Sequence, residues 1–185
     1  TIGNKTYDLD KPFFVFATQN PIEQEGTYQL PEAQLDRFMF NVIIQYPSKQ
    51  EENEIVKNNN LIELDSISPI IKKDKIITFQ NLVRNIPVSD NVINYAVEFV
   101  RNTRNSSSAP KITQKWLTWG AGPRATSFLI LASKAYALLQ GKTTPDISDI
   151  QYVMKPILRH RIIPNFNAEA EGMSRDNILD ELMQE

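Results

Sequence analysis

The chain has 185 residues, of which 41% are hydrophobic and 23% are charged. This length and composition are typical of a globular protein with one domain or two small lobes, and they exclude a disordered tail. The net charge of -2 provides no overall attraction to a nucleic-acid backbone or an anionic membrane, so we expect no nucleic-acid partner.

Residue counts also exclude several kinds of site. The sequence has no cysteine and one histidine, so we expect no disulfide, no thiolate metal site and no histidine-rich metal centre. The absence of cysteine fits a reducing, cytoplasmic location. The apolar runs stay well below the roughly 18 residues of a membrane span, so we expect no membrane-spanning segment.

The first 46 residues carry strand patterns. Phe13–Ala17 is a continuous apolar run, typical of a strand covered on both faces in a parallel sheet. A second strand is expected over Met39–Gln45, after a short helix that Pro31 opens. Two strands do not make such a sheet, so this part of the chain predicts a small remnant of a larger α/β domain.

Helical patterns dominate from residue 47 onward. Ser89 and Thr144 are the expected caps of two of these helices, with Pro145 in the first turn of the second. One face of the helix near residues 123–140 is expected to be core, because apolar residues recur there at helical spacing: Phe128, Leu131, Ala132, Ala135, Leu138 and Leu139. The predicted fold is mostly α, with helices near residues 49–60, 74–85, 89–103, 123–140 and 146–160.

Polar residues follow the first predicted strand, at Thr18-Gln19-Asn20. Open α/β sheets hold their ligands at the carboxyl ends of the strands. The Asn20 side chain could bond both a phosphate and an attacking water there. Spacing alone equally allows Asn20-Pro21 to be a simple turn after a strand, and the residues leave both interpretations open.

Arg37 ends the short helix predicted near residues 31–38. Its planar, permanently charged guanidinium suits stabilisation of the charge that spreads over a transferring phosphoryl group. The structural alternative is strong, because an arginine at a helix C-terminus interacts favourably with the helix dipole and could pair with Asp36 or Glu32.

Arg124 lies in the first turn of a helix that Pro123 opens, within Gly120–Thr126. A cation at this end of a helix costs a few tenths of a kcal/mol to about 1 kcal/mol, so helix stability does not explain it. An anion at that terminus would explain it, since the free backbone N–H groups and the arginine would converge there. We therefore predict that Arg124 contributes to binding an anionic ligand.

Two glycine motifs are interpreted as decoys. Gly120–Ala125 fits the dinucleotide pattern G-x-G-x-x-A, but no buried strand precedes it and Pro123 occupies the loop. Gly141–Thr143 resembles the end of a phosphate-binding loop, but Tyr136 stands where such a loop needs glycine, so a helix cap and turn are expected.

The remaining candidates have plainer interpretations. Glu23 and Glu25 lie in a predicted loop, where acids are usually solvated. His160 has no second histidine to share a metal, so we expect it to pack or to contact another subunit. Trp116 and Trp119 are expected in the core or at a subunit contact.

Residues 17–38, ATQNPIEQEGTYQLPEAQLDRF, and 120–126, GAGPRAT, resemble the MoxR-type AAA+ ATPases, and the resemblance extends over nearly the whole chain. It implies that residues 1–46 are the rear part of an α/β nucleotide-binding core and that 47–185 are its helical lid. It also implies that Asn20 is sensor 1, that Arg124 is sensor 2, and that Arg37 is an arginine finger for the neighbouring subunit. Gly122 stands where serine is usual, which is expected to loosen the turn and leave Arg124 in place.

The resemblance further implies ATP hydrolysis with Mg²⁺, coupled to chaperone-like remodelling or maturation of a partner protein. A ring homo-oligomer, commonly a hexamer, and a partner with a von Willebrand factor A domain follow from the family. The Walker A lysine and the Walker B acids would precede Thr1, so we expect this chain alone to be inactive and to hold no nucleotide tightly. Two rivals are a non-catalytic helical adaptor module and a nucleic-acid remodeller, which would need a basic stripe.

Overall fold

A computed structural model of the chain describes residues 3–19, 30–58 and 68–185. It divides into two compact units, one formed by Thr1–Thr18 and Val42–Asn81 and the other by Gln19–Asn41 and Leu82–Glu185. The described residues are mostly helical, and their only sheet has two strands. The predicted mostly α fold class is confirmed.

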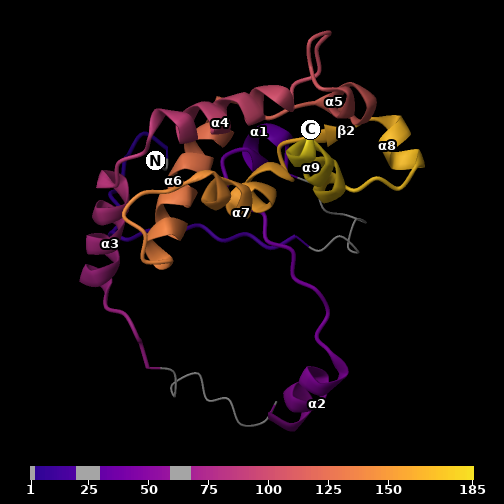
Figure 1. The fold of residues 1–185 in the computed structure, drawn as a ribbon. Helices are drawn as coiled ribbons and strands as arrows, with labels where there is room; N and C mark the ends of the chain where they lie inside the picture. The colour runs from indigo at the N-terminus through magenta and orange to yellow at the C-terminus, as the bar shows by residue number, and fades with distance from the viewer. Residues whose placement is uncertain (1–2, 20–29, 59–67) are drawn as a thin grey trace. The chain divides into compact units, whose positions relative to one another are not determined.

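The elements follow one another along the chain as Figure 1 shows. The first unit contains α2 (Lys49–Asn58), and α3 (Lys73–Asn85) runs from the first unit into the second. The second unit contains the remaining elements: α1 (Glu32–Leu35), α4 (Asp90–Asn102), α5 (Lys111–Trp116), β1 (Leu117–Trp119), α6 (Pro123–Leu139), α7 (Ile147–Leu158), β2 (Ile163–Pro164), α8 (Phe166–Ala170) and α9 (Arg175–Gln184).

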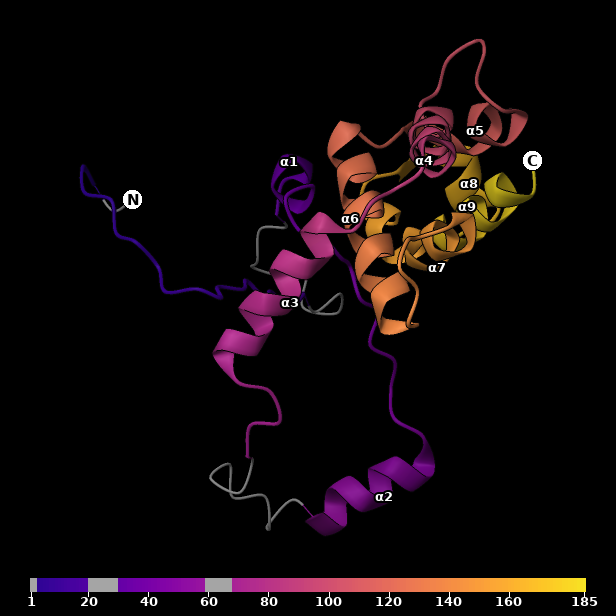
Figure 2. The same ribbon diagram turned by 60° about the vertical axis from the view of Figure 1, so that its left-hand side comes forward.

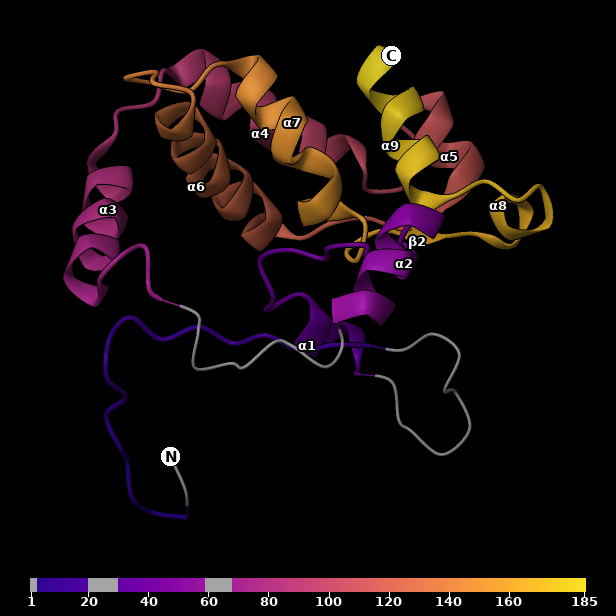
Figure 3. The same ribbon diagram turned by 90° about the horizontal axis from the view of Figure 1, so that it is seen from below.

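The core of the second unit lies where α6 packs against α7 and α4 (Figure 2). Leu129 on α6, Met154 on α7 and Val100 on α4 are fully buried there. Burying a side chain of this size contributes about 1.5–3 kcal/mol, so these helices stabilise one another mainly through their apolar faces. At the other end of the unit α5 packs against α9 (Figure 3), and Trp116 joins the same core.

The buried face of α6 differs from the predicted one. Leu131 and Leu139 were expected in the core but are exposed, Leu139 by 82%. The buried positions are instead Ala125, Leu129, Ala132, Ser133 and Ala137. Helix α6 packs against two neighbours, and small residues on its buried side allow both to approach, so the largest apolar side chains do not mark the core face.

The start of α7 is also corrected. The helix begins at Ile147 and not near Thr144, because Asp146 is the N-cap. The Asp146 carboxylate accepts from the Asp149 N–H at 3.2 Å, and the Asp149 carboxylate accepts from the Asp146 N–H at 2.9 Å. This reciprocal capping box satisfies two backbone donors at the helix start, which Thr144 and Pro145 do not do.

Gly141 follows the end of α6 and caps it, as the sequence predicts for Gly141–Thr143. It adopts φ +75°, a left-handed conformation that favours glycine. The Gly141 N–H bonds the Leu138 carbonyl at 3.0 Å, and the Lys142 N–H bonds the Ala137 carbonyl at 2.8 Å. This is a Schellman cap. Lys142 then donates to the carboxylates of Asp146 and Asp149. Gly141 and Lys142 therefore stabilise the turn that connects α6 to α7.

The two predicted strands, Phe13–Ala17 and Met39–Gln45, do not form in the described chain. Phe16 is 91% exposed and Ile44 is 89% exposed. A strand is held by hydrogen bonds to a neighbouring strand, and no described segment pairs with either run. The strands that do form, β1 and β2, pair antiparallel with Leu117 opposite Pro164, and the sequence patterns did not predict them.

Candidate functional site

The structure describes two of the three expected site residues. Arg37 and Arg124 both lie in the second unit. Asn20 lies outside the described residues, as do Glu23 and Glu25. The site is therefore built from the end of α1, the start of α6 and the end of α7.

Asp36, the residue after α1, joins two arginines. Its Oδ1 accepts from Arg161 Nε at 2.9 Å, and its Oδ2 forms an ion pair with Arg124. The Arg161 side chain is 1% exposed, Asp36 is 29% exposed and Arg124 is 49% exposed. One carboxylate thus holds a buried arginine on one oxygen and a half-exposed arginine on the other.

Arg124 lies in the first turn of α6, as the sequence predicts, and no acid lies in that turn. Its negative partner comes from Asp36, 88 residues earlier in the chain. Because the Arg124 side chain is half exposed, water screens the pair, which contributes about 1 kcal/mol or less. A ligand with several negative charges can therefore compete with Asp36 for Arg124.

Arg37 follows Asp36 directly and is exposed. In the part of the chain that the structure describes, no group accepts a hydrogen bond from its guanidinium. The pairings with Asp36 or Glu32 that formed the structural alternative are not seen, and Asp36 is already held by Arg124 and Arg161. Nothing described in this unit therefore accounts for the charge of Arg37.

Arg161 is the most enclosed charged side chain of the site. Its Nε donates to Asp36 Oδ1 and its Nη2 to the carbonyls of Asp36 and Phe38, at 2.8 and 2.5 Å. Its Nη1 donates to the carbonyls of Met39 and Ile157. Burial lowers the pKa of Arg161, whereas its bond to Asp36 raises it. Arginine does not lose its proton in proteins, so the buried Arg161 side chain stays positively charged.

The two residues before Arg161 hold the same segment. Arg159 donates to the Asn41 carbonyl at 3.1 Å and forms a two-pronged pair with Asp176 at 3.0 and 2.9 Å. The His160 Nε2–H donates to the Phe38 carbonyl at 3.1 Å. The residues Arg159-His160-Arg161, at the end of α7, thus hydrogen-bond the main chain at residues 36–41. For His160 this is packing within the chain, one of the two kinds of contact expected from the sequence.

The imidazole of His160 is held neutral. Burial, followed by the positive charge of Arg161, lowers the pKa of His160 from 6.5 to about 4. Its Nδ1 is buried and has no hydrogen-bond partner among the described residues. A second proton would add charge beside two arginines, so the single proton stays on Nε2, where Phe38 accepts it.

The loop before α6 is fixed by contact with the end of α4. A Cβ at Gly120 would overlap the carbonyl oxygen of Thr103, so glycine is required there by close approach of the two backbones. Arg104 Nε donates to the Ala121 carbonyl at 2.9 Å. Gly122, in contrast, has an extended conformation, and a Cβ there would meet nothing within 4 Å. A serine at 122 would fit the same backbone.

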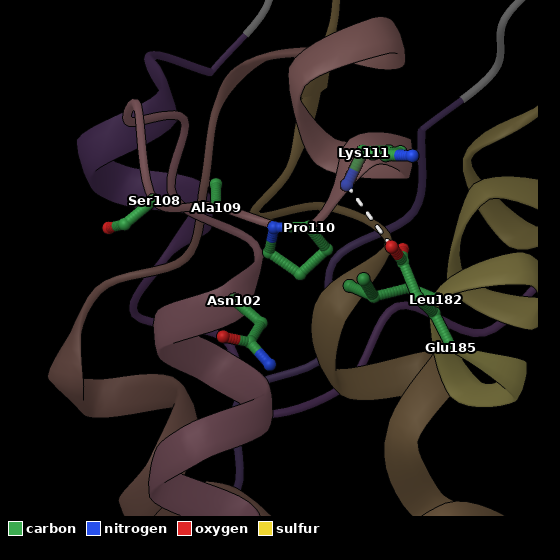
Figure 4. Close-up of a pocket in the computed structure, with 7 residues that line it drawn as sticks. All are labelled: Asn102, Ser108, Ala109, Pro110, Lys111, Leu182 and Glu185. Atoms are coloured by element: carbon green, nitrogen blue, oxygen red, sulfur yellow. Dashed lines mark hydrogen bonds between the residues drawn. The ribbon is translucent and has the colours of Figure 1, made fainter.

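A surface pocket lies elsewhere in the second unit, between the end of α4, the start of α5 and α9 (Figure 4). It includes Asn102 and Pro110, and the Lys111 N–H donates to the Glu185 carboxylate at 3.2 Å at its edge. None of the expected site residues lines it. Within the described ranges no group of acids and histidine is placed to hold a metal ion, and no helix there is both long and apolar enough for a membrane.

Sequence patterns pointed to Arg37 and Arg124 but missed Asp36, Arg159 and Arg161 as members of the site. The available signal was the pair of arginines flanking His160 at the end of α7, which is unusual in a segment that packs. What they contact is mostly main chain, and sequence does not reveal that.

Family models match two parts of the chain. Residues 1–40 match the model of the ATPase family associated with various cellular activities (AAA), and residues 109–182 match the AAA lid domain. The chain is 38% identical over 184 residues to the uncharacterised protein YeaC of Bacillus subtilis and 34% identical over 185 residues to chaperone MoxR1 of Mycobacterium tuberculosis.

A solved structure of a candidate ATPase from Cytophaga hutchinsonii superposes on 100% of this chain, with a TM-score of 0.87 and 36% identity. The chain covers 56% of that structure, 55% of YeaC and 49% of MoxR1, so it spans about half the length of these relatives. With matches to both the AAA and the AAA lid models and to MoxR1 over its whole length, the chain belongs to the MoxR family of AAA+ ATPases.

Proposed function

We propose that this chain supplies the nucleotide-sensing and arginine-finger residues of an ATPase that couples ATP binding and hydrolysis to remodelling or maturation of a partner protein. The observation that carries the proposal is the contrast between Arg37 and its neighbours. Asp36, Arg124 and Arg161 satisfy one another, whereas Arg37 is exposed and meets no described acceptor. Because the Arg37 side chain makes no ion pair with these neighbours, it is available to contact another subunit.

The chain's residues take distinct roles in this proposal. Asn20 orients the attacking water, and Arg124 leaves Asp36 to bind the terminal phosphate of ATP. Arg37 reaches the nucleotide of the adjacent subunit and stabilises charge in the transition state. Mg²⁺ and a P-loop lysine, held by the remainder of a full-length protein, neutralise the phosphates. Within it, residues 1–46 contribute to the nucleotide-binding core and 47–185 form the lid, in line with the AAA and lid matches.

A finger that acts across an interface requires an oligomer, and we propose a ring, commonly hexameric in this family. The relative MoxR1 is named a chaperone, which supports a protein as the substrate of remodelling. We propose a partner with a von Willebrand factor A domain as the first to test.

The deciding experiment measures ATP turnover of the full-length protein with Arg37→Ala. We expect kcat to fall by roughly a thousandfold or more, as for other arginine fingers, while ATP binding is retained. Arg101→Ala is the matched control, since Arg101 is exposed in the last turn of α4. Unchanged turnover in Arg37→Ala would contradict the proposal and favour a non-catalytic helical adaptor.

A further inference from the structure

We infer that Arg161 is a positioning residue for Arg37, acting by holding the main chain on both sides of it. The inference rests on the proposed role of Arg37 as an arginine finger. Its direct observation is that one nitrogen, Arg161 Nη2, donates to the carbonyl of Asp36 at 2.8 Å and to that of Phe38 at 2.5 Å. These two residues flank Arg37 in the chain.

All the N–H donors of the Arg161 guanidinium have acceptors, and most of these acceptors lie next to Arg37 in the chain. A guanidinium has five N–H donors in a rigid plane. One meets the Asp36 carboxylate, three meet the carbonyls of Asp36, Phe38 and Met39, and the last meets Ile157 at the end of α7. The ring of Phe128 on α6 lies 5.0 Å from the guanidinium carbon, where a cation is favoured.

The segment that carries Arg37 cannot hold itself in place. Helix α1 has four residues and none of them is buried. A helix this short is not stable in water without external contacts. The carbonyls that follow the helix, at Asp36, Phe38 and Met39, need donors, and Arg161 provides them. The direction in which Arg37 leaves the chain is therefore set by α7.

The neighbours of Arg161 strengthen the same hold. His160 shares the Phe38 carbonyl at 3.1 Å, and Arg159 fixes the Asn41 carbonyl at 3.1 Å. The Asn41 N–H donates back to the Pro156 carbonyl at 2.8 Å. The chain from 36 to 41 is thus attached to the end of α7 at several points. Arg161 makes the contacts on either side of Arg37.

The test uses Arg161→Lys, which keeps the charge but replaces five planar donors with three on a flexible stem. Arg101→Lys is the matched control, because Arg101 is exposed and meets no acceptor in the described part of the chain. If Arg161→Lys does not fold, Asp36→Asn replaces it in the exchange measurement, since this change weakens the bond to Arg161 Nε and leaves every carbonyl acceptor in place. It is not used for turnover, because it also weakens the pair with Arg124.

The first measurement is amide hydrogen exchange in the 185-residue chain. The N–H groups of Arg37, Phe38 and Asn41 donate to the carbonyls of Gln34, Leu35 and Pro156. We expect these three amides to exchange at least about tenfold faster in Arg161→Lys, with the amides of α4 and α6 unchanged. Equal exchange in Arg161→Lys and Arg101→Lys would overturn the inference.

The second measurement is a double-mutant cycle on ATP turnover of the full-length protein. Arg161→Lys should lower kcat on the order of 10- to 100-fold with KM for ATP nearly unchanged, and should cause no further loss in the Arg37→Ala background. An equal loss in both backgrounds would show that Arg161 does not act through Arg37. If Arg37→Ala alone leaves kcat unchanged, the finger proposal fails, and the exchange measurement then decides whether Arg161 holds this segment.

Discussion

The hydroxyl oxygen of Thr103 accepts a hydrogen bond from the backbone N–H of Ala121 at 2.9 Å. The same hydroxyl donates to the Val100 carbonyl at 2.7 Å, in the last turn of α4. The loop that precedes Arg124 is therefore attached to the end of α4, and Gly120 lies directly against the Thr103 carbonyl. This attachment places the start of α6.

Gly120→Ala should destabilise the chain by about 1–3 kcal/mol, because the added methyl group overlaps the Thr103 carbonyl and forces two backbones apart. Urea unfolding followed by circular dichroism measures this. Gly122→Ser is the control. It fits the open space at this N-cap and should be neutral or stabilising by a few tenths of a kcal/mol. Equal stability of the two variants would show that the loop moves away freely.

Asp149→Ala should cost about 1–3 kcal/mol. Its buried carboxylate accepts from the Asp146 N–H and from Lys142 Nζ, so the change leaves both donors without this partner. Thermal unfolding compares it with Asp180→Ala, which breaks the partly exposed pair with Lys155 and should cost about 1 kcal/mol or less. A larger loss for Asp180→Ala would contradict the role of the capping box.

The two arginines that share Asp36 should differ in their effect on stability. Arg124→Gln removes a screened, half-exposed pair and should change the free energy of unfolding by about 1 kcal/mol or less. Asp36→Ala leaves the buried Arg161 without its carboxylate and should cost about 1.5–3 kcal/mol. Urea unfolding of both variants tests the order, and a reversed order would show that the carboxylate of Asp36 does not stabilise the buried Arg161.

The stability of the chain should depend on His160 between pH 6.5 and about 4, because its pKa falls to about 4 on folding. The unfolded chain binds the proton first as the pH falls. The contribution of His160 to stability is thus complete above pH 6.5, is lost progressively as the pH falls toward 4, and changes no further below that. Arg161 and Arg159 oppose the added charge, whereas Asp36 and the Phe38 carbonyl favour it.

His160→Gln provides the comparison for this pH dependence, since an amide can still donate to Phe38 and does not titrate. The urea midpoint of the original chain should fall more steeply with decreasing pH than that of His160→Gln. Parallel curves would show that His160 takes up its proton equally in the folded and unfolded chain.

The long helices could be predicted from sequence because their signals are local. Apolar spacing and end residues located α4, α6 and α7 to within a few residues. The runs at 13–17 and 39–45 carry equally clear strand patterns, yet a strand also needs a partner, which a local pattern does not provide. The shorter elements α5, α8 and β2 have too few residues to show a period.

The candidate site was predictable only in part, for a related reason. Arg37 and Arg124 lie in recognisable strings, whereas Arg161 acts on carbonyl oxygens 122 to 125 residues away. Every residue has a carbonyl, so no residue type at positions 36–39 signals that an arginine will bind there. Among the acceptors of Arg161, the carboxylate of Asp36 is the one that a residue type could have signalled.

The attachment of residues 36–41 to the end of α7 also has a mechanical consequence. Several hydrogen bonds join them, so a rotation of α7 would displace these residues with it. If Arg37 is the proposed arginine finger, a movement of the helical unit would therefore move Arg37 as well. In the proposed ring, the reach of Arg37 toward a neighbour would follow the tilt of the subunit's own helices. A pair of spin labels on α7 and at the exposed Phe40, which leaves Arg37 in place, should keep one separation throughout the cycle.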